Sequence, residues 1–133
     1  MPGLPPPAGG ERQTLIEFLR FNQNAFFSVA HGMTDEQARA TPSASALSVG
    51  GLVKHAAGVQ RGWLARVVAA PDFPPPDPRP LEEQMAEHAD QHVMRDDETL
   101  ADLLEDLRTV NDEVVTAFAG KDLDTPVPVP HEV

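Results

Sequence analysis

The sequence predicts an all-α helical bundle, and three observations support this prediction. Three stretches of about 20 residues repeat apolar side chains at spacings of three and four, the pattern of a helix with one buried face. Each stretch is bounded by capping residues, glycine or proline. No stretch alternates apolar and polar residues with comparable strength. Long helices joined by connections of these lengths pack antiparallel, so we expect an up-down bundle.

The first long helix is expected to run from about Glu11 to His31, with Gly32 as its stop. Its buried stripe is expected to contain Leu15, Phe18, Leu19, Asn22, Phe26 and Val29. The next four residues of interest, Thr34-Asp35-Glu36-Gln37, form a capping box that should open a short helical turn.

The second long helix is expected to begin at a cap formed by Ser48 or Ser45 and to end before Pro71. Trp63 is expected to anchor its core face. A shorter helix should follow from Leu81 to about Gln91.

The third long helix has Thr99 as its expected N-cap and Gly120 as its expected end. Its predicted buried stripe consists of Leu100, Leu103, Leu104, Leu107, Val110, Val114 and Phe118.

A chain of 133 residues has the length of one domain. We expect the helical bundle to occupy residues 11–123, with a proline-rich linker at 71–80 inside it. Residues 1–10 are rich in proline and glycine and predict a disordered tail. Residues 124–133 alternate proline with valine and predict an extended C-terminal tail.

The formal net charge of −11 argues against partners that carry phosphates, both nucleic acid and anionic membrane surfaces. No apolar run approaches the roughly 20 residues that span a bilayer. The chain has no cysteine, which excludes disulfides, a thiolate nucleophile and sulfur ligands. We therefore expect a cytoplasmic protein whose partners are small molecules.

One face of the second helix combines a histidine with three glycines. At 100° per residue, Gly51, His55, Gly58 and Gly62 fall within an arc of about 60°. Each glycine costs about 0.5–1 kcal/mol relative to alanine in a helix, so this face predicts a close approach by another helix or by a ligand. His55 is either a satisfied core histidine or a ligand-binding residue.

Other polar residues also allow two interpretations. His88 and His92 are four residues apart and point the same way on a helix, either as ordinary solvated histidines or as metal ligands. Asn22 and Asn111 fall on the predicted buried stripes. They either set the helix register through core hydrogen bonds or line a polar pocket together with the glycines.

Three segments resemble a known family. The turn DEQAR and the pattern GGLVKHxAxVxRxW, together with DETLADLLEDLRTVNDEVVTAF, resemble the DinB/YfiT-like metalloenzyme superfamily. The chain is most similar to the branch that contains mycothiol-dependent S-transferases, and the likeness covers Glu11 to Val133.

The resemblance implies a four-helix bundle that binds zinc or nickel through three histidines. His55 matches the ligand on the second helix. The other two ligands belong to a fourth bundle helix with a His-x-x-x-His pattern, and this sequence has no fourth helix after the third long one. His88 and His92 have the same spacing on the shorter helix and would have to replace those ligands. The chain is therefore expected to be a fragment or a short member with an incomplete metal site.

The expected function is that of a metal-dependent S-transferase that conjugates mycothiol or a related thiol to electrophiles. Two alternatives remain open at this stage. One is a non-catalytic protein that binds or sequesters small molecules, and the other is a homodimeric helical scaffold whose exposed apolar faces cover each other.

Overall fold

The computed structural model describes Leu4 and residues 9–129. This part of the chain contains five helices and no strand: α1 (Glu11–Ala30), α2 (Asp35–Arg39), α3 (Val49–Ala69), α4 (Leu81–Asp90) and α5 (Leu100–Ala119). The all-α prediction is confirmed, and each expected helix is present. Residues 1–3, 5–8 and 130–133, which belong to the two expected tails, lie outside the described residues.

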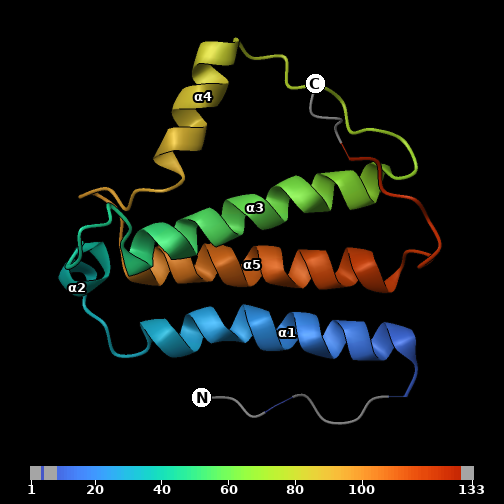
Figure 1. Ribbon diagram of the computed structural model, residues 1–133, viewed down its shortest axis with the longest axis horizontal. Helices are drawn as coiled ribbons and strands as arrows, with labels where there is room; N and C mark the ends of the chain where they lie inside the picture. Colours follow the sequence, from blue (N-terminus) through green and yellow to red (C-terminus); the bar gives the residue numbers. More distant parts are fainter. Residues whose placement is uncertain (1–3, 5–8, 130–133) are drawn as a thin grey trace.

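The three long helices lie side by side, with α3 and α5 in the most extensive contact (Figure 1). Helix α4 stands off this layer, above the first half of α3. Contacts such as Lys54 with Glu98 and Arg61 with Asp106 show that α3 and α5 run in the same direction. The expected up-down order is therefore wrong for this pair, because the proline-rich connection and α4 carry the chain back along the bundle before α5 begins.

The core forms where α3 meets α5. Leu107, Val53 and Val110 are its largest fully buried side chains. The predicted stripe of α5 is confirmed at Leu100, Leu103, Leu107 and Val110, which are all buried. Thr99 caps this helix by accepting a hydrogen bond from the backbone N–H of Asp102.

Helix α1 buries a different face from the one predicted. Leu15, Phe18 and Val29 from the expected stripe are 44%, 50% and 64% exposed, whereas Gln23 and Ala30 are buried. Helices α3 and α5 both contact Gln23. Of the predicted stripe, Phe26 packs against the core, whereas the three residues named above remain exposed. The prediction failed because periodicity identifies an apolar face but does not say which neighbour lies against it.

Three amide side chains form a polar layer between the three long helices. Gln23 of α1 donates to Gln60 of α3 at 2.9 Å, and Gln60 donates to the side-chain oxygen of Asn111 of α5 at 2.5 Å. Asn111 is buried, as its position in the stripe predicts. The expected burial of Asn22 is wrong: this residue is exposed and donates to the carbonyl of Phe18 in its own helix.

The short helix α2 joins the start of α5 to the rest of the bundle. Thr34 and Gln37 form the expected capping box. The carboxylate of Asp35 accepts a hydrogen bond from the backbone N–H of Leu100 at 2.8 Å. Arg39 donates to the carbonyl oxygens of Arg95 and Glu98. The DEQAR turn therefore determines where α5 begins.

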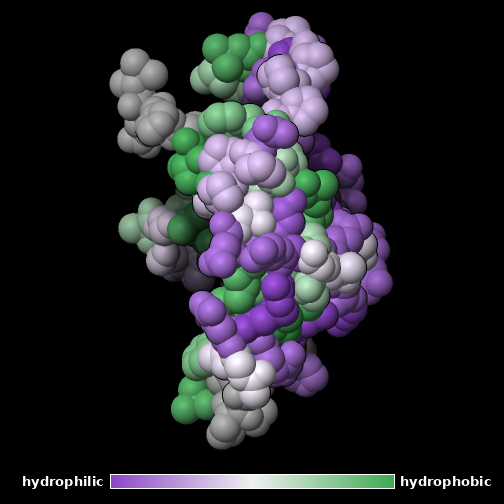
Figure 2. Space-filling model, turned by 90° about the vertical axis from the view of Figure 1, so that its right-hand side faces the viewer, coloured by the Kyte–Doolittle hydropathy of each residue, from purple (hydrophilic) through white to green (hydrophobic). Residues whose placement is uncertain are grey.

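The end of the bundle where α1 begins and α3 and α5 end has a mainly hydrophilic surface, with apolar side chains scattered over it (Figure 2). Among the described residues, no helix is both long enough and apolar enough to cross a lipid bilayer.

Candidate functional site

The glycine face of α3 is covered by the segment that follows α4. A Cβ atom at Gly50 would overlap the side chain of Met94, and one at Gly51 would overlap the carbonyl oxygen of His92. At Gly58 the added atom would meet the side-chain amide of Gln91. The expected close approach is present, but the connection after α4 makes it, where another helix or a ligand was expected. Only glycine leaves room for this segment.

The last glycine of this face differs from the others. A Cβ atom at Gly62 would meet nothing within 4 Å, so the covering segment ends before this point. The face is closed at its beginning by the segment and open at its end.

A partly buried lysine holds the covering segment in place. The ammonium group of Lys54 donates to the carboxylates of Asp90 and Glu98, each at 2.9 Å, and to the carbonyl oxygen of Val93 at 3.1 Å. Its side chain is only 14% exposed. The hydrogen bond from Lys54 holds the pKa of the Asp90 carboxyl below its ordinary value. This lysine clamp joins α3 to both ends of the connection and positions the residues between them.

The clamp brings three histidines together. The rings of His55 and His92 are stacked, with centroids 4.2 Å apart and an angle of 27° between their planes. The ring of His88 meets His92 edge to face at 5.1 Å. The Nδ1 atom of His92 lies 2.9 Å from the carbonyl oxygen of His88 and donates to it, which leaves Nε2 as the acceptor nitrogen.

His55 has the electrostatics of a neutral imidazole. Burial lowers its pKa, and the charges of His92 and His88 lower it further. Its Nδ1 atom is buried and has no hydrogen-bond partner among the residues that the structure describes. A buried polar atom without a partner costs free energy, and a neutral imidazole nitrogen is a good donor to zinc or nickel.

The fit of these residues to a metal ion is limited to one ligand. His55 offers a free nitrogen, but its ring is stacked on His92, so the nitrogen atoms of the two rings do not converge on a shared point. Within residues 9–129, no group of three histidine, aspartate or glutamate side chains is placed to hold a metal ion. The residues present therefore fit His55 as a single ligand and do not form a complete three-residue site.

A pocket of about 340 Å³ opens beside the histidines, between α3 and α4. It is lined by His55, Gly58, Val59, Gly62, Trp63, Arg66, His88 and Gln91. Two of the glycines predicted to line a pocket, Gly58 and Gly62, do so. Gly51 lies instead under the carbonyl of His92, and Asn22 and Asn111 are not among the lining residues.

Trp63 contributes to this pocket and not to the core. Its side chain is 47% exposed, and the guanidinium group of Arg66 lies over its ring, 5.1 Å from the centroid. The expectation of a core anchor is wrong because α3 turns this position away from α5. The ring is exposed on one side of the site and can contact a bound molecule.

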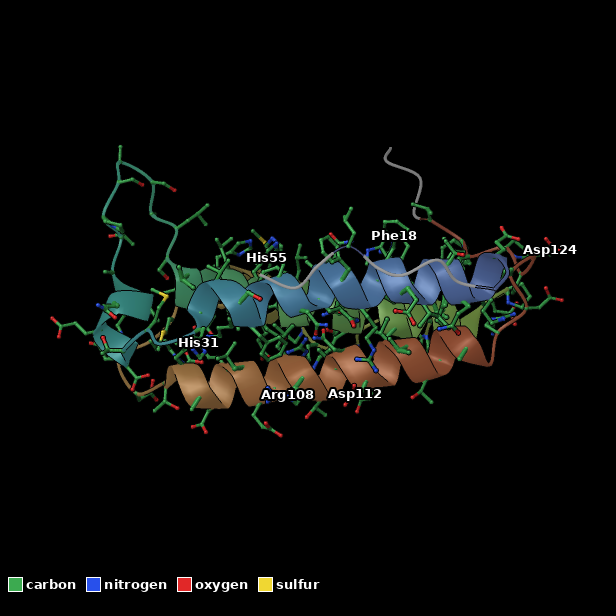
Figure 3. The ribbon with its side chains drawn as sticks, turned by 90° about the horizontal axis from the view of Figure 1, so that it is seen from below. Phe18, His31, His55, Arg108, Asp112 and Asp124 are labelled. Atoms are coloured by element: carbon green, nitrogen blue, oxygen red, sulfur yellow. The ribbon has the colours of Figure 1, made fainter. Side chains whose placement is uncertain are left out.

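A second hollow, of about 270 Å³, lies between α1 and α3 and has a wholly apolar lining. Its walls are Ala25, Phe26, Val29, Val49, Leu52 and Val53. Phe18 lies on the same side of α1 and points away from α5 (Figure 3). We call this hollow the apolar groove.

Several residues of the site were not singled out from the sequence. Lys54 and Gln91 act through the connection after α4, whose path the helical periodicity does not predict. Arg66 follows Trp63 by three residues, so their contact could have been expected from helix geometry. Gln23 and Gln60 gave no signal, because Gln23 lies between Asn22 and Asn24 and Gln60 precedes Arg61, so neither stands out from its polar neighbours.

Comparison with known proteins agrees with the fold. No curated protein and no solved structure matches this chain. The family model described as Mycothiol-S-transferase matches residues 14–133, nearly the whole chain. The match includes the DEQAR turn, the glycine face with His55 and all of α5. The protein therefore belongs to the mycothiol S-transferase family, within the DinB/YfiT-like proteins.

Proposed function

We propose that this protein acts as a metal-dependent thiol S-transferase, with mycothiol or a related thiol as cosubstrate and His55 as a ligand of a zinc or nickel ion. The observation that carries the proposal is the buried Nδ1 atom of His55, which has no partner within the described residues and lies beside a pocket in a member of this family. Because the chain has no cysteine, the sulfur must come from a bound thiol.

A bound zinc or nickel ion would supply a Lewis acid that favours the thiolate form of the cosubstrate. The chain itself supplies the surroundings of that sulfur. Burial lowers the pKa of His55 and so favours the neutral ring, the form that binds a metal. Gly62 leaves the wall open where the electrophile enters, and Trp63 offers an apolar surface beside it.

The test measures metal content and thiol conjugation in the same preparations. The protein with added zinc or nickel is expected to consume mycothiol in the presence of an aryl chloride, with release of chloride. His55→Ala is expected to lose both the bound metal and the activity. His31→Ala, which removes an exposed histidine at the end of α1, is the matched control and should keep both.

His88 and His92 are tested in the same way. Retention of metal in the His88→Ala and His92→Ala variants would show that these rings are not ligands, and loss of metal would assign them to the ligand set. Unchanged metal content in His55→Ala would contradict the proposal.

The apolar groove favours a second function, the binding of a hydrophobic small molecule or of a second copy of this chain. Its lining is wholly apolar, and neighbouring Leu15 and Phe18 are half-exposed. Sedimentation across a dilution series distinguishes the two. A dimer that dissociates in Val29→Lys supports a second copy, whereas a monomer that binds a hydrophobic dye in the groove supports a small molecule.

A further inference from the structure

Arg66 differs from every other cation of the chain. The sequence has ten lysine and arginine residues, and within the described residues all of them except Arg66 lie at hydrogen-bond or ion-pair distance from an oxygen atom. Acidic residues outnumber basic ones by 21 to 10, so partners are plentiful. In so acidic a chain, an arginine that has no oxygen partner within residues 9–129 requires an explanation.

The local sequence prevents Arg66 from pairing within its own helix. The positions three and four residues away are Gly62, Trp63, Ala69 and Ala70, none of which carries a charge. Its guanidinium group lies over the ring of Trp63 instead. A guanidinium in this arrangement keeps its in-plane N–H groups available for a planar acceptor.

The pocket that Arg66 lines contains no carboxylate. By contrast, the pocket beside Arg108 includes Asp35, and the one beside Lys121 includes Asp122. The side-chain amide of Gln91 also lines the Arg66 pocket, and it makes no hydrogen bond with the described residues. Among the described residues, the pocket therefore presents two sets of unpaired N–H donors and no negative charge.

The net charge of −11 does not oppose local anion binding, because the field of distant carboxylates is screened over about 10 Å in ordinary salt. The hydrogen bonds that Arg66 can donate decide which chemical group binds in this pocket. Arginine and a carboxylate form two parallel hydrogen bonds, which makes the pair both strong and specific. The apolar wall formed by Val59 and Trp63 suits a flat, apolar body attached to that group.

We infer that this pocket binds a small carboxylate compound, with its carboxylate on Arg66 and its apolar body against Trp63. This inference also names the electrophile of the proposed reaction, a small carboxylate compound that receives the thiol. That part of it rests on the proposed function. With 4-chloro-3-nitrobenzoate, the thiolate sulfur would bond to the ring carbon that bears chlorine. The carbon–chlorine bond breaks, chloride leaves with its electron pair, and the thiol proton passes to solvent.

The binding test needs neither metal nor thiol. Trp63 is the only tryptophan of the chain, which has no tyrosine, so its fluorescence reports on this pocket. Titration of the metal-free protein with benzoate is expected to quench Trp63 saturably. Benzamide, which has the same shape without the charge, should bind about tenfold more weakly. Arg66→Gln should remove this preference, and Arg66→Lys should restore only part of it.

Arg61→Gln is the matched control, because it removes the same charge from the same helix outside the pocket. It should bind benzoate as the unaltered protein does. Absence of saturable benzoate binding, equal affinities for benzoate and benzamide, or an unchanged preference in Arg66→Gln would each overturn the inference.

The conjugation assay separates this inference from the proposed function. Benzoate binding without any conjugation would leave the carboxylate site in place and contradict the transferase. Conjugation of uncharged aryl chlorides, with no preference for the carboxylate compound, would support the transferase and contradict the carboxylate site. If both hold, Arg66→Gln should raise the KM for 4-chloro-3-nitrobenzoate about tenfold, with little change for its amide.

Discussion

The two sides of α3 are covered in different ways. On the glycine side, the connection after α4 lies directly on the backbone, and Lys54 holds it with three hydrogen bonds. On the side toward α1, the large apolar residue Leu52 is 42% exposed and, with Val49, lines the apolar groove. Small residues marked the side with close contacts, and large apolar residues marked the side that is exposed.

This difference reverses the usual expectation that the most apolar face of a helix is the buried one. A glycine face has little area to bury, but it allows backbone atoms and polar groups to meet at short distances. The candidate site lies on this glycine side. The following predictions test the difference, from the largest expected effect to the smallest.

Gly51→Ala should have the largest effect, because the new Cβ atom would meet the backbone carbonyl of His92, which cannot rotate away. We expect a loss of about 2–3 kcal/mol in the free energy of unfolding, measured by urea denaturation. Gly62→Ala is the matched control. It adds the same atom in open space and should stabilise the protein by about 0.5–1 kcal/mol. Equal effects of the two substitutions would show that the glycine contacts do not matter.

Lys54→Met should release the covering segment while preserving the length of the side chain. The carboxylate of Glu98, only 16% exposed, would lose its closest cation. We expect a loss of about 1–2 kcal/mol in the free energy of unfolding. The NMR contact between the His55 and His92 rings should weaken as well. Arg108→Met, which removes an exposed pair with Glu105, should change stability by less than about 0.5 kcal/mol. A ring contact that persists in Lys54→Met would contradict the role of the clamp.

Val29→Ala should have a small effect, since this side chain is 64% exposed on the apolar groove. In the monomer we expect a change of less than about 0.5 kcal/mol in the free energy of unfolding. Val53→Ala removes the same atoms from a side chain that is 1% exposed, and it should cost about 2 kcal/mol. A large loss in Val29→Ala would mean that this face is covered in solution, and its dependence on protein concentration would identify a dimer.

The smallest effect concerns the connection before α4. Hydrogen bonds from the Arg79 side chain and backbone lower the pKa of Asp77 to about 2. Arg79→Gln should return this pKa toward 3.8, measured by NMR of the carboxyl carbon. Because the folded pKa is depressed, any favourable contribution of this carboxylate is complete above the unfolded value and is lost as the pH falls through about 2. Arg61→Gln should leave the titration of Asp77 unchanged. If the pKa of Asp77 rose equally in Arg61→Gln and Arg79→Gln, the change in net charge would be the cause.

Much of the fold could be predicted from local signals. The caps at Thr34, Ser48 and Thr99 are hydrogen bonds between residues three positions apart, so the sequence contains both partners. The stripe of α5 was also predicted correctly, because this helix is amphipathic and its other faces are polar.

The rest depended on which elements meet, and local patterns do not contain this information. Helix α1 has apolar residues on two faces, and only its contact with α5 decides which one is buried. The direction of α5 relative to α3 depends on how the proline-rich connection runs. The candidate site could be predicted in part: His55 and the glycines were recognised, whereas Lys54 and Arg66 gained their roles from distant segments.

The amide layer of Gln23, Gln60 and Asn111 has a consequence for evolution and design. Each amide finds a complementary group only when the three helices are in a single axial alignment, and a slip of one turn, about 5.4 Å, would place them against leucine and valine. The layer thus fixes the axial register of the three helices from within the bundle. Substitutions at the mouth of the pocket can alter what it binds without letting the helices slide, so the two properties are free to change separately.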